Sequence, residues 1–415
     1  AEALGLAERT FVSKIAKIPE AKRSERQAAK LRVWFQEHGP ESARYKAYIA
    51  ALAKRNSYTR TLPTSMVMVE SPEPKPTYLR VRGVYNDLGE RVERGVPAAL
   101  PDMPDDLPAN RLGLAKWLVS GDNPLTARVA VNRYWQRYFG TGIVKTSEDF
   151  GVQGNKPSHP ELLDWLATEF VRSGWDVAGM QRLIVTSATY RQAALSNRKL
   201  RDIDPENRLI ARGPRMRLSG PVLRDQALAV SGLLVEKIGG PSVSPYQPAN
   251  LWVEMSMGLK YKQSKGDSLF RRSLYTIWKR TVNPPSMAIL DAADREACWV
   301  GVKRTNTPLQ ALTLLNETAF FESARHLAQR MLAEDDPVGY GFRVTTASMP
   351  SAEERRILEG ALVEYRASFL SDRAAAKELI AFGSTPVPKA DPVELAALTA
   401  LANVLLNLDE VITKE

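Results

Sequence analysis

Apolar residues recur at helical intervals along most of the chain. Leucines at every third or fourth position between residues 395 and 408 form one continuous stripe, which is the pattern of a helix that buries one face. A second stripe spans residues 309–320, and its expected buried members are Leu309, Leu312, Leu315, Ala319 and Phe320. A single helix over residues 308–332 is therefore predicted.

Four local patterns predict where helices begin. Each places a capping side chain three residues before Glu or Gln, and the four capping residues are Ser158, Thr307, Ser351 and Asp391. Glycine favours the position just after a helix, and Gly121, Gly174 and the pair at 239–240 are predicted to lie there. The segment 223–238 is accordingly predicted to be one helix that ends at this pair.

The pattern also divides the chain into three parts. Residues 1–60 read as a helical arm of two helices, broken near Pro19 and at 38–40. Residues 61–108 hold β-prone runs at 66–70 (MVMVE) and 77–85, followed by a proline-rich linker. In residues 109–415 the apolar residues again recur at helical intervals. The predicted fold is mainly α: a compact multi-helix domain with a small β element and an N-terminal helical arm.

Composition narrows the class of protein. With 44% hydrophobic and 25% charged residues the chain is ordinary globular material. Its longest nearly apolar stretch, 395–408, is shorter than the roughly 20 residues of a membrane span. Cys298 is the only cysteine, which excludes an internal disulfide, a multi-cysteine metal site and a CxxCH haem attachment. No cofactor and no metal site are expected in this chain.

The charge balance favours acidic partners. The formal net charge is +10, which steers anions toward the molecule over long range. An anion-binding face is predicted from the clustered arginines, namely Arg208, Arg212, Arg215, Arg217, Arg271, Arg280 and Arg304. The alternative, which carries more weight, is that these arginines pair with carboxylates or cap helix ends. Nucleic acid is disfavoured, because no reading module and no basic run interleaved with aromatics occurs.

Catalytic motifs of the common enzyme classes are absent. The sequence has no GxSxG, no GxGxxG opening a helix and no GKS or GKT run. His159 lies beside Glu161 and Asp164, with Asp149 upstream, and such a group could bind a divalent cation or poise a general base. A structural role at a helix start is the favoured interpretation. Cys298 is likewise more consistent with a buried thiol than with a nucleophile.

Long blocks of the sequence carry a family resemblance. They occur in order as NRYWQRYFG, TSEDFG, PSHPELLDWLA, TSATYRQ, DPENRL, LRDQALAVSGLLVEKIGG, RRSLYTIWKRT, TNTPLQALTLLN and LNLDE. The chain thereby resembles the planctomycete-type domain of unknown function (the PSD domain) that follows cytochrome c-like domains in large exported proteins. The resemblance implies a periplasmic or other extracytoplasmic location and further domains upstream. It agrees with an N-terminus that lacks Met and signal-peptide features, as in a processed or cut chain.

The chain departs from the family pattern at several positions. The resemblance implies His, Asp, an acidic residue and two arginines where this chain has Tyr78, Val84, Pro221, Gly301 and Val302. Loss of polar groups with retention of packing residues is expected of a paralogue that has kept its fold and lost a polar site. The five positions are therefore predicted to converge on one cleft.

Two hypotheses about function follow. The favoured one is a binding or structural subunit of a cytochrome-associated assembly without its own catalysis, whose partners are a cytochrome c-bearing or paralogous subunit, or an acidic ligand. The alternative is an enzyme that acts on carbohydrate-like or other organic substrates and passes electrons to a separate cytochrome c domain. Its candidate catalytic residues are Asp149, His159, Arg224, Asp225, Arg272 and Lys279.

Overall fold

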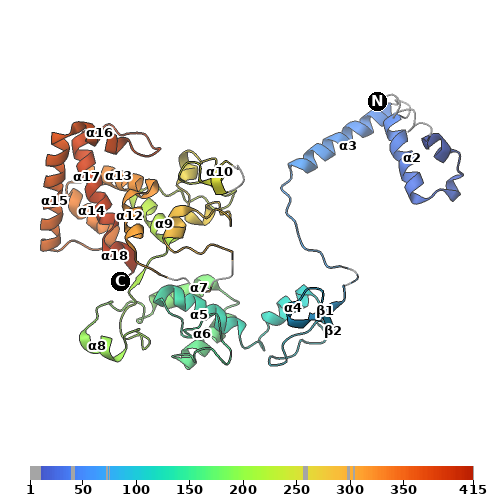
Figure 1. Ribbon diagram of the computed structural model, residues 1–415, viewed down its shortest axis with the longest axis horizontal. Helices are drawn as coiled ribbons and strands as arrows, with labels where there is room; N and C mark the ends of the chain where they lie inside the picture. The colour runs from blue at the N-terminus through green and yellow to red at the C-terminus, as the bar shows by residue number, and fades with distance from the viewer. Residues whose placement is uncertain are drawn as a thin grey trace. The chain divides into compact units, whose positions relative to one another are not determined.

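The computed structural model describes residues 11–38, 43–71, 73, 75–255, 260–296, 300–301 and 304–414 (Figure 1). The chain divides into two compact units, Ala1–Glu93 and Arg94–Glu415. The described residues are mostly helical, and their strands form two small two-stranded sheets. The predicted mainly α fold is confirmed.

The first unit combines helices with one β ribbon. Its helices include α2 (Glu25–His38) and α3 (Ala43–Thr61), as expected for the helical arm. Strand β1 (Thr77–Arg80) pairs antiparallel with β2 (Leu88–Val92).

The prediction of β structure at 66–70 was wrong. This run has no regular structure, and its side chains, Met66 among them, are exposed. Among the described residues no strand pairs with this run, so its β-prone residues lack the pairing that stabilises a strand.

The main core of the second unit surrounds α17 (Pro392–Leu406). This helix packs against α13 (Thr318–Leu332), α15 (Ala352–Ser371) and α16 (Arg373–Ala381), with α9 (Gly220–Ser231) and α14 (Pro337–Thr346) completing the cluster (Figure 1). The predicted leucine stripe is confirmed at 395, 398, 401 and 405, which have no exposed surface. Its last member, Leu408, lies beyond α17 and is only partly buried.

A second core lies in the N-terminal part of this unit. It is built from α5 (Thr126–Phe139), α6 (Pro160–Arg172) and α7 (Val177–Thr186), preceded by α4 (Arg111–Leu118). The two cores are tied by the pairing of β3 (Met216–Arg217) with β4 (Thr413–Lys414). The remaining helices are α8 (Arg198–Ile203), α10 (Leu251–Met255), α11 (Pro285–Ile289), α12 (Pro308–Asn316) and α18 (Asp409–Ile412).

Helices begin at all four predicted places, and in three of them the predicted capping residue is the N-cap. Thr307 and Ser351 form capping boxes, and the Asp391 side chain accepts from the backbone of Glu394. Ser158 was wrongly predicted to cap. His159 is the N-cap residue of α6 instead, without a side-chain cap bond, and Ser158 lies one residue too early to reach the first turn.

Two helices end earlier than predicted. Extended backbone at Glu317 separates α12 from α13, so residues 308–332 are not one helix. The break turns Leu309 and Leu312 outward, and both are more than half exposed, contrary to the predicted stripe. Helix α9 ends at the left-handed Gly232 rather than at the glycine pair 239–240. Gly174, in contrast, follows α6 with positive φ, as expected of a glycine at a helix end.

A buried ion pair lies inside the main core. Arg325 and Glu322 both have no exposed surface, and Arg325 Nη2 is 3.3 Å from Glu322 Oε1. Arg325 Nη1 also donates to the Ile380 carbonyl at 2.6 Å, and Glu322 accepts from the backbone N–H groups of Ser384 and Thr385. Within the described part of the chain, no helix has the length and hydrophobicity to cross a bilayer.

Candidate anion-binding site

A pocket of about 240 Å³ lies where the two cores of the second unit meet. Its wall consists of Tyr134, Arg137, Tyr138, Gln181, Met216, Arg217, Leu218, Ser219, Val222 and Arg304. These residues come from α5, α7, β3, the start of α9 and the segment before α12. We refer to this cavity as the arginine pocket, because three of its lining residues are arginines.

Helix α5 supplies one side of the arginine pocket. Tyr134, Arg137 and Tyr138 are spaced three and four residues apart, so they share one face of the helix. The helix is anchored by Val131 and Trp135, which are buried in the second core, and Tyr134 and Tyr138 pack against that core as well. Arg137 is exposed and has no hydrogen-bond or ion-pair partner among the described residues.

The strand pair β3–β4 supplies the opposite side. Arg217 lies opposite Thr413, and the Leu218 N–H donates to the Ile412 carbonyl at 3.0 Å. Arg217 Nη1 donates to Asn306 Oδ1 at 2.7 Å. The C-terminal strand therefore fixes the position of the Arg217 backbone, while a neutral amide orients its guanidinium.

Arg304 completes the set of three arginines. Its Nη1 lies 2.9 Å from the Met216 sulfur, which is only a weak acceptor. Burial and the neighbouring charge of Arg137 lower the pKa of Arg304 from its ordinary value. In the described structure, none of the three arginines forms a salt bridge, although Asp291 is near enough for the charge of Arg217 to act on its carboxylate.

The N-terminus of α9 adds further positive potential. Ser219 is its N-cap residue and lines the pocket, but its side chain makes no cap hydrogen bond, and the first turn has no acidic residue. The backbone N–H groups at a helix start attract anions. The three arginines and the start of α9 thus give the pocket a positive potential.

The structure separates the predicted anion-binding residues. Arg217 and Arg304 share the arginine pocket. Arg208 donates to the carbonyls of residues 142 and 143, and Arg212 donates to the carbonyls of residues 204 and 205. Arg215 pairs with Asp409 on the surface.

The other two predicted anion-binding arginines lie away from the pocket. Arg271 donates to the carbonyls of Lys237 and Gly239 and stacks on Tyr275, with the guanidinium carbon 3.7 Å from the ring centroid. Arg280 is exposed.

Two of the candidate catalytic residues, Arg224 and Asp225, hold the backbone between residues 269 and 273. Arg224 is buried and donates to the carbonyls of Leu269 (2.7 Å) and Arg271 (2.9 Å). Asp225 accepts from the Ser273 N–H at 2.7 Å and lies 3.6 Å from Arg272. Burial lowers the pKa of the Arg224 guanidinium, although Asp225 partly offsets this. Lys279, outside this group, lies over the ring of Trp252.

Asp149, His159 and Asp164 have separate partners. Asp149 accepts from the Gly151 N–H at 2.7 Å, the His159 Nδ1 lies 3.1 Å from the Ser158 hydroxyl, and Asp164 pairs with Arg128 at 2.7 Å. The described residues contain no group of three or more His, Cys, Asp or Glu that could hold a metal ion. Cys298 lies outside the described residues.

The predicted cleft of lost polar groups stays a prediction. Tyr78 and Val84 belong to the first unit, whereas Pro221, in the first turn of α9, and Gly301 belong to the second. Val302 lies outside the described residues.

Arg137 was missed by the sequence reasoning. Arg137 is far in the sequence from the clustered arginines at 208–217 and 271–280, from which the anion-binding face was predicted. The available signal was its position three residues after Tyr134 and one before Tyr138, which places a cation on an aromatic helix face.

The fold defines a basic, mainly helical protein whose second unit holds a pocket lined by three arginines. The model of the PSD1 family, described as a protein of unknown function (DUF1553), matches residues 110–362. The match covers more than half of the chain, so the chain belongs to this family. All three pocket arginines lie inside the matched region, whereas β4 lies beyond it. Neither a curated protein nor a solved structure matches the chain.

Proposed function

We propose that this chain is a binding protein that holds an acidic group of a protein partner in the arginine pocket. The observation that carries the proposal is the convergence of Arg137, Arg217 and Arg304, without carboxylate partners among the described residues, on the start of α9. A guanidinium binds carboxylate, phosphate or sulfate through paired N–H donors. Three such groups in one pocket are therefore suited to one multivalent or bidentate oxyanion.

The size of the pocket supports an acidic group rather than a large free ligand. Its volume of about 240 Å³ is below the roughly 300–1,000 Å³ of sites that enclose drug-sized molecules. A single carboxylate, phosphate or sulfate group fits, while the rest of the molecule that carries it stays outside. A side chain or terminus presented by a partner meets this requirement.

The cellular setting is part of the proposal. We place the chain outside the cytoplasm, as a binding or structural subunit of a cytochrome-associated assembly. The support is the resemblance described under the sequence analysis together with the net charge of +10. Haem would belong to the partner, because a single cysteine cannot form a CxxCH attachment.

The enzyme alternative has weaker support. Arg224 and Asp225 bind the backbone between residues 269 and 273, and Asp149 binds its own loop. A general base must reach the proton that it abstracts, and these groups serve separate local structures.

A sulfate titration at constant ionic strength tests the proposal. We expect sulfate to raise the melting temperature of the wild-type chain by mass action. The substitutions Arg137→Gln and Arg304→Gln are each expected to weaken sulfate binding about tenfold, since a charged hydrogen bond contributes about 1.5–3 kcal/mol. Arg280→Gln, which removes the same charge outside the pocket, is the matched control.

The outcomes are distinct. If Arg280→Gln weakens sulfate binding as much as Arg304→Gln does, the effect is one of net charge and the pocket is not the site. If sulfate leaves the melting temperature of the wild-type chain unchanged, the proposal fails at its first step.

A further inference from the structure

The segment before α4 is an acidic part of an otherwise basic chain. Residues 95–110 contain three aspartates, Asp102, Asp105 and Asp106, and no lysine, arginine or histidine, whereas the whole chain has a formal net charge of +10. Asp105 and Asp106 are both exposed, and neither has a hydrogen-bond or ion-pair partner among the described residues. Two adjacent carboxylates repel each other, so a cationic partner would stabilise the pair.

The two carboxylates belong to the central residues of a β-turn. The Leu107 N–H donates to the Pro104 carbonyl at 3.0 Å, which places Asp105 and Asp106 at the two central positions. We refer to residues 104–107 as the acidic turn. Met103 and Leu107, on either side of the aspartates, are half-buried. The aspartates are therefore the part of this turn that a partner can reach.

Hydrogen bonds on both sides hold the acidic turn in place. Trp117 of α4 donates from its indole Nε1 to the Pro101 carbonyl at 2.9 Å, and Arg94 donates to the Ala109 carbonyl at 2.6 Å. Four prolines between residues 95 and 110 restrict the backbone further. A segment that is ordered before binding loses little conformational entropy when a partner binds it.

The arginine pocket has the complementary charge. Its three guanidinium groups form no ion pair among the described residues, and the start of α9 adds positive potential. A guanidinium binds a carboxylate through paired N–H donors. The acidic turn and the arginine pocket are thus oppositely charged surfaces of one chain, and neither forms an ion pair in the described structure.

The acidic turn does not occupy the pocket of its own chain. Both lie in the second unit, and the pocket wall contains no residue of the segment 95–110. The hydrogen bonds of Trp117 and Arg94 fix this segment where it is. A second copy of the chain, in contrast, presents its acidic turn freely.

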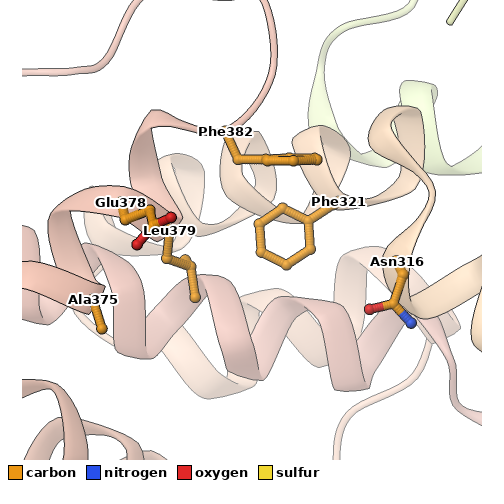
Figure 2. A pocket seen from close by; sticks show the side chains of 6 residues that line it. All are labelled: Asn316, Phe321, Ala375, Glu378, Leu379 and Phe382. Atoms are coloured by element: carbon orange, nitrogen blue, oxygen red, sulfur yellow. The ribbon is translucent and has the colours of Figure 1, made fainter. Parts of the chain in front are cut away.

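Two other cavities of the second unit do not suit an acidic turn. A cleft of about 610 Å³ beside α12 has Glu317 in its lining and no lysine or arginine. A hollow of about 380 Å³ is lined by Phe321, Phe382 and Leu379, and its charged lining residue is Glu378 (Figure 2). Like charge disfavours a carboxylate in both cavities. Of these three cavities, the arginine pocket is the one that fits the turn.

We infer that the acidic turn of one copy of this chain enters the arginine pocket of a second copy. The inference rests on the proposed function, because it names the protein partner whose acidic group the pocket holds. One carboxylate of the turn enters the pocket, and its neighbour lies at the mouth. The net charge of +10 makes whole copies repel one another, so the contact is weak and is populated at high protein concentration.

Sedimentation equilibrium of the full chain tests this inference. We expect the weight-average mass of the wild type to rise above that of one chain between about 10 and 500 µM, the concentration range of a weak contact. The turn variant, Asp105→Asn with Asp106→Asn, removes both carboxylates with little change in shape. It should associate at least about tenfold more weakly.

Two further double variants complete the set. The pocket variant, Arg217→Gln with Arg304→Gln, should also associate at least about tenfold more weakly, although it lowers the net charge that makes the copies repel. The control, Glu334→Gln with Asp335→Asn, neutralises two exposed carboxylates elsewhere and changes the net charge as the turn variant does. It should associate like the wild type.

A mixture of the turn variant and the pocket variant gives the sharpest result. The turn variant keeps its pocket and the pocket variant keeps its turn, so the two should associate with each other although neither associates alone. A fluorescent label on the turn variant lets fluorescence-detected sedimentation follow this mixed complex.

The inference is overturned if the wild type stays monomeric over the whole concentration range, if the turn variant associates like the wild type, or if the mixture does not associate. The proposed function is tested separately, because the turn variant retains all three arginines and should still show the sulfate-induced rise in melting temperature. A monomeric wild type with an intact sulfate response contradicts this inference alone. A missing sulfate response in the wild type contradicts the proposed function.

Discussion

The guanidinium of Arg304 lies against the sulfur of Met216, with Nη1 2.9 Å from Sδ. A thioether neither neutralises a cation nor matches a carboxylate as an acceptor. Arg325, in contrast, is fully buried and forms an ion pair with Glu322. The core thus pairs its buried cation with an internal carboxylate, whereas the cations of the arginine pocket form no ion pair among the described residues.

Placing a carboxylate beside Arg304 should occupy the pocket from within. Met216→Glu is expected to form an internal ion pair and to abolish the sulfate-induced rise in melting temperature, although all three arginines remain. Met216→Gln has nearly the same shape without charge and should retain the rise. Equal sulfate responses in the two variants would show that Arg304 does not contact the anion.

Binding of acidic partners should weaken as salt increases. Exposed charges are screened over about 8 Å at physiological ionic strength, and the arginines of the pocket reach solvent. We expect the Kd of a labelled hexaglutamate peptide, measured by fluorescence anisotropy, to rise at least tenfold between about 50 and 500 mM NaCl. A hexaglutamine peptide should not bind. A salt-independent Kd for hexaglutamate would mean that charge does not drive the contact.

The buried ion pair should be essential to stability. Arg325→Met leaves Glu322 charged and unpaired inside the core, and breaking such a pair typically costs about 3–5 kcal/mol. The measurement is the free energy of unfolding in urea. Arg355→Met removes an exposed partner of Asp336 and should change stability far less. Equal losses of unfolding free energy in Arg325→Met and Arg355→Met would indicate that burial of the ion pair does not cause the destabilisation.

Gly383 should tolerate no side chain. Its φ is +105°, and a Cβ there would lie 2.6 Å from the Glu322 carboxyl carbon. Gly383→Ala is therefore expected to destabilise the chain by at least about 1 kcal/mol, as measured by the urea midpoint. Gly360→Ala, on helix α15 with open space around the added carbon, is the control and should be neutral or stabilising. A neutral Gly383→Ala would contradict the described loop geometry.

Glu317 should make stability depend on pH. Burial raises its folded-state pKa, so its contribution is fully present below the unfolded pKa of about 4.3 and is lost as the pH rises through the folded value. Glu317→Gln, which keeps a capping oxygen, is expected to stabilise the chain at pH 7 relative to wild type. Near pH 4 this advantage should vanish. The same difference in unfolding free energy at both pH values would show that Glu317 is not desolvated.

Much of the fold could be predicted from local patterns. Capping at Thr307, Ser351 and Asp391 depends on residues within one turn, and the stripe in α17 depends on spacing within one helix. The break at Glu317 was missed, because the residue caps α13 with its side chain while its own backbone is extended. The spacing of apolar residues alone does not reveal a helix break at such a residue.

The site was less predictable than the fold, because it depends on tertiary contacts. Arg208 and Arg217 look alike in the sequence, yet Arg208 donates to the backbone carbonyls of residues 142 and 143 while Arg217 lines the pocket. Arg137 joins Arg217 and Arg304 only through the packing of α5 against the segments that carry them. The clustering of arginines in the sequence identifies basic segments. Which guanidinium groups are free of carbonyl or carboxylate partners depends on tertiary contacts.

The central claim is that the arginine pocket takes an anionic group, and a crystal soaked in selenate tests it most directly. Selenate has the shape and charge of sulfate and is located by the anomalous scattering of selenium. The account predicts an anomalous peak within hydrogen-bonding distance of Arg137, Arg217 and Arg304, and its loss in crystals of Met216→Glu. Anomalous peaks elsewhere on the protein, with none in the pocket, would contradict the account.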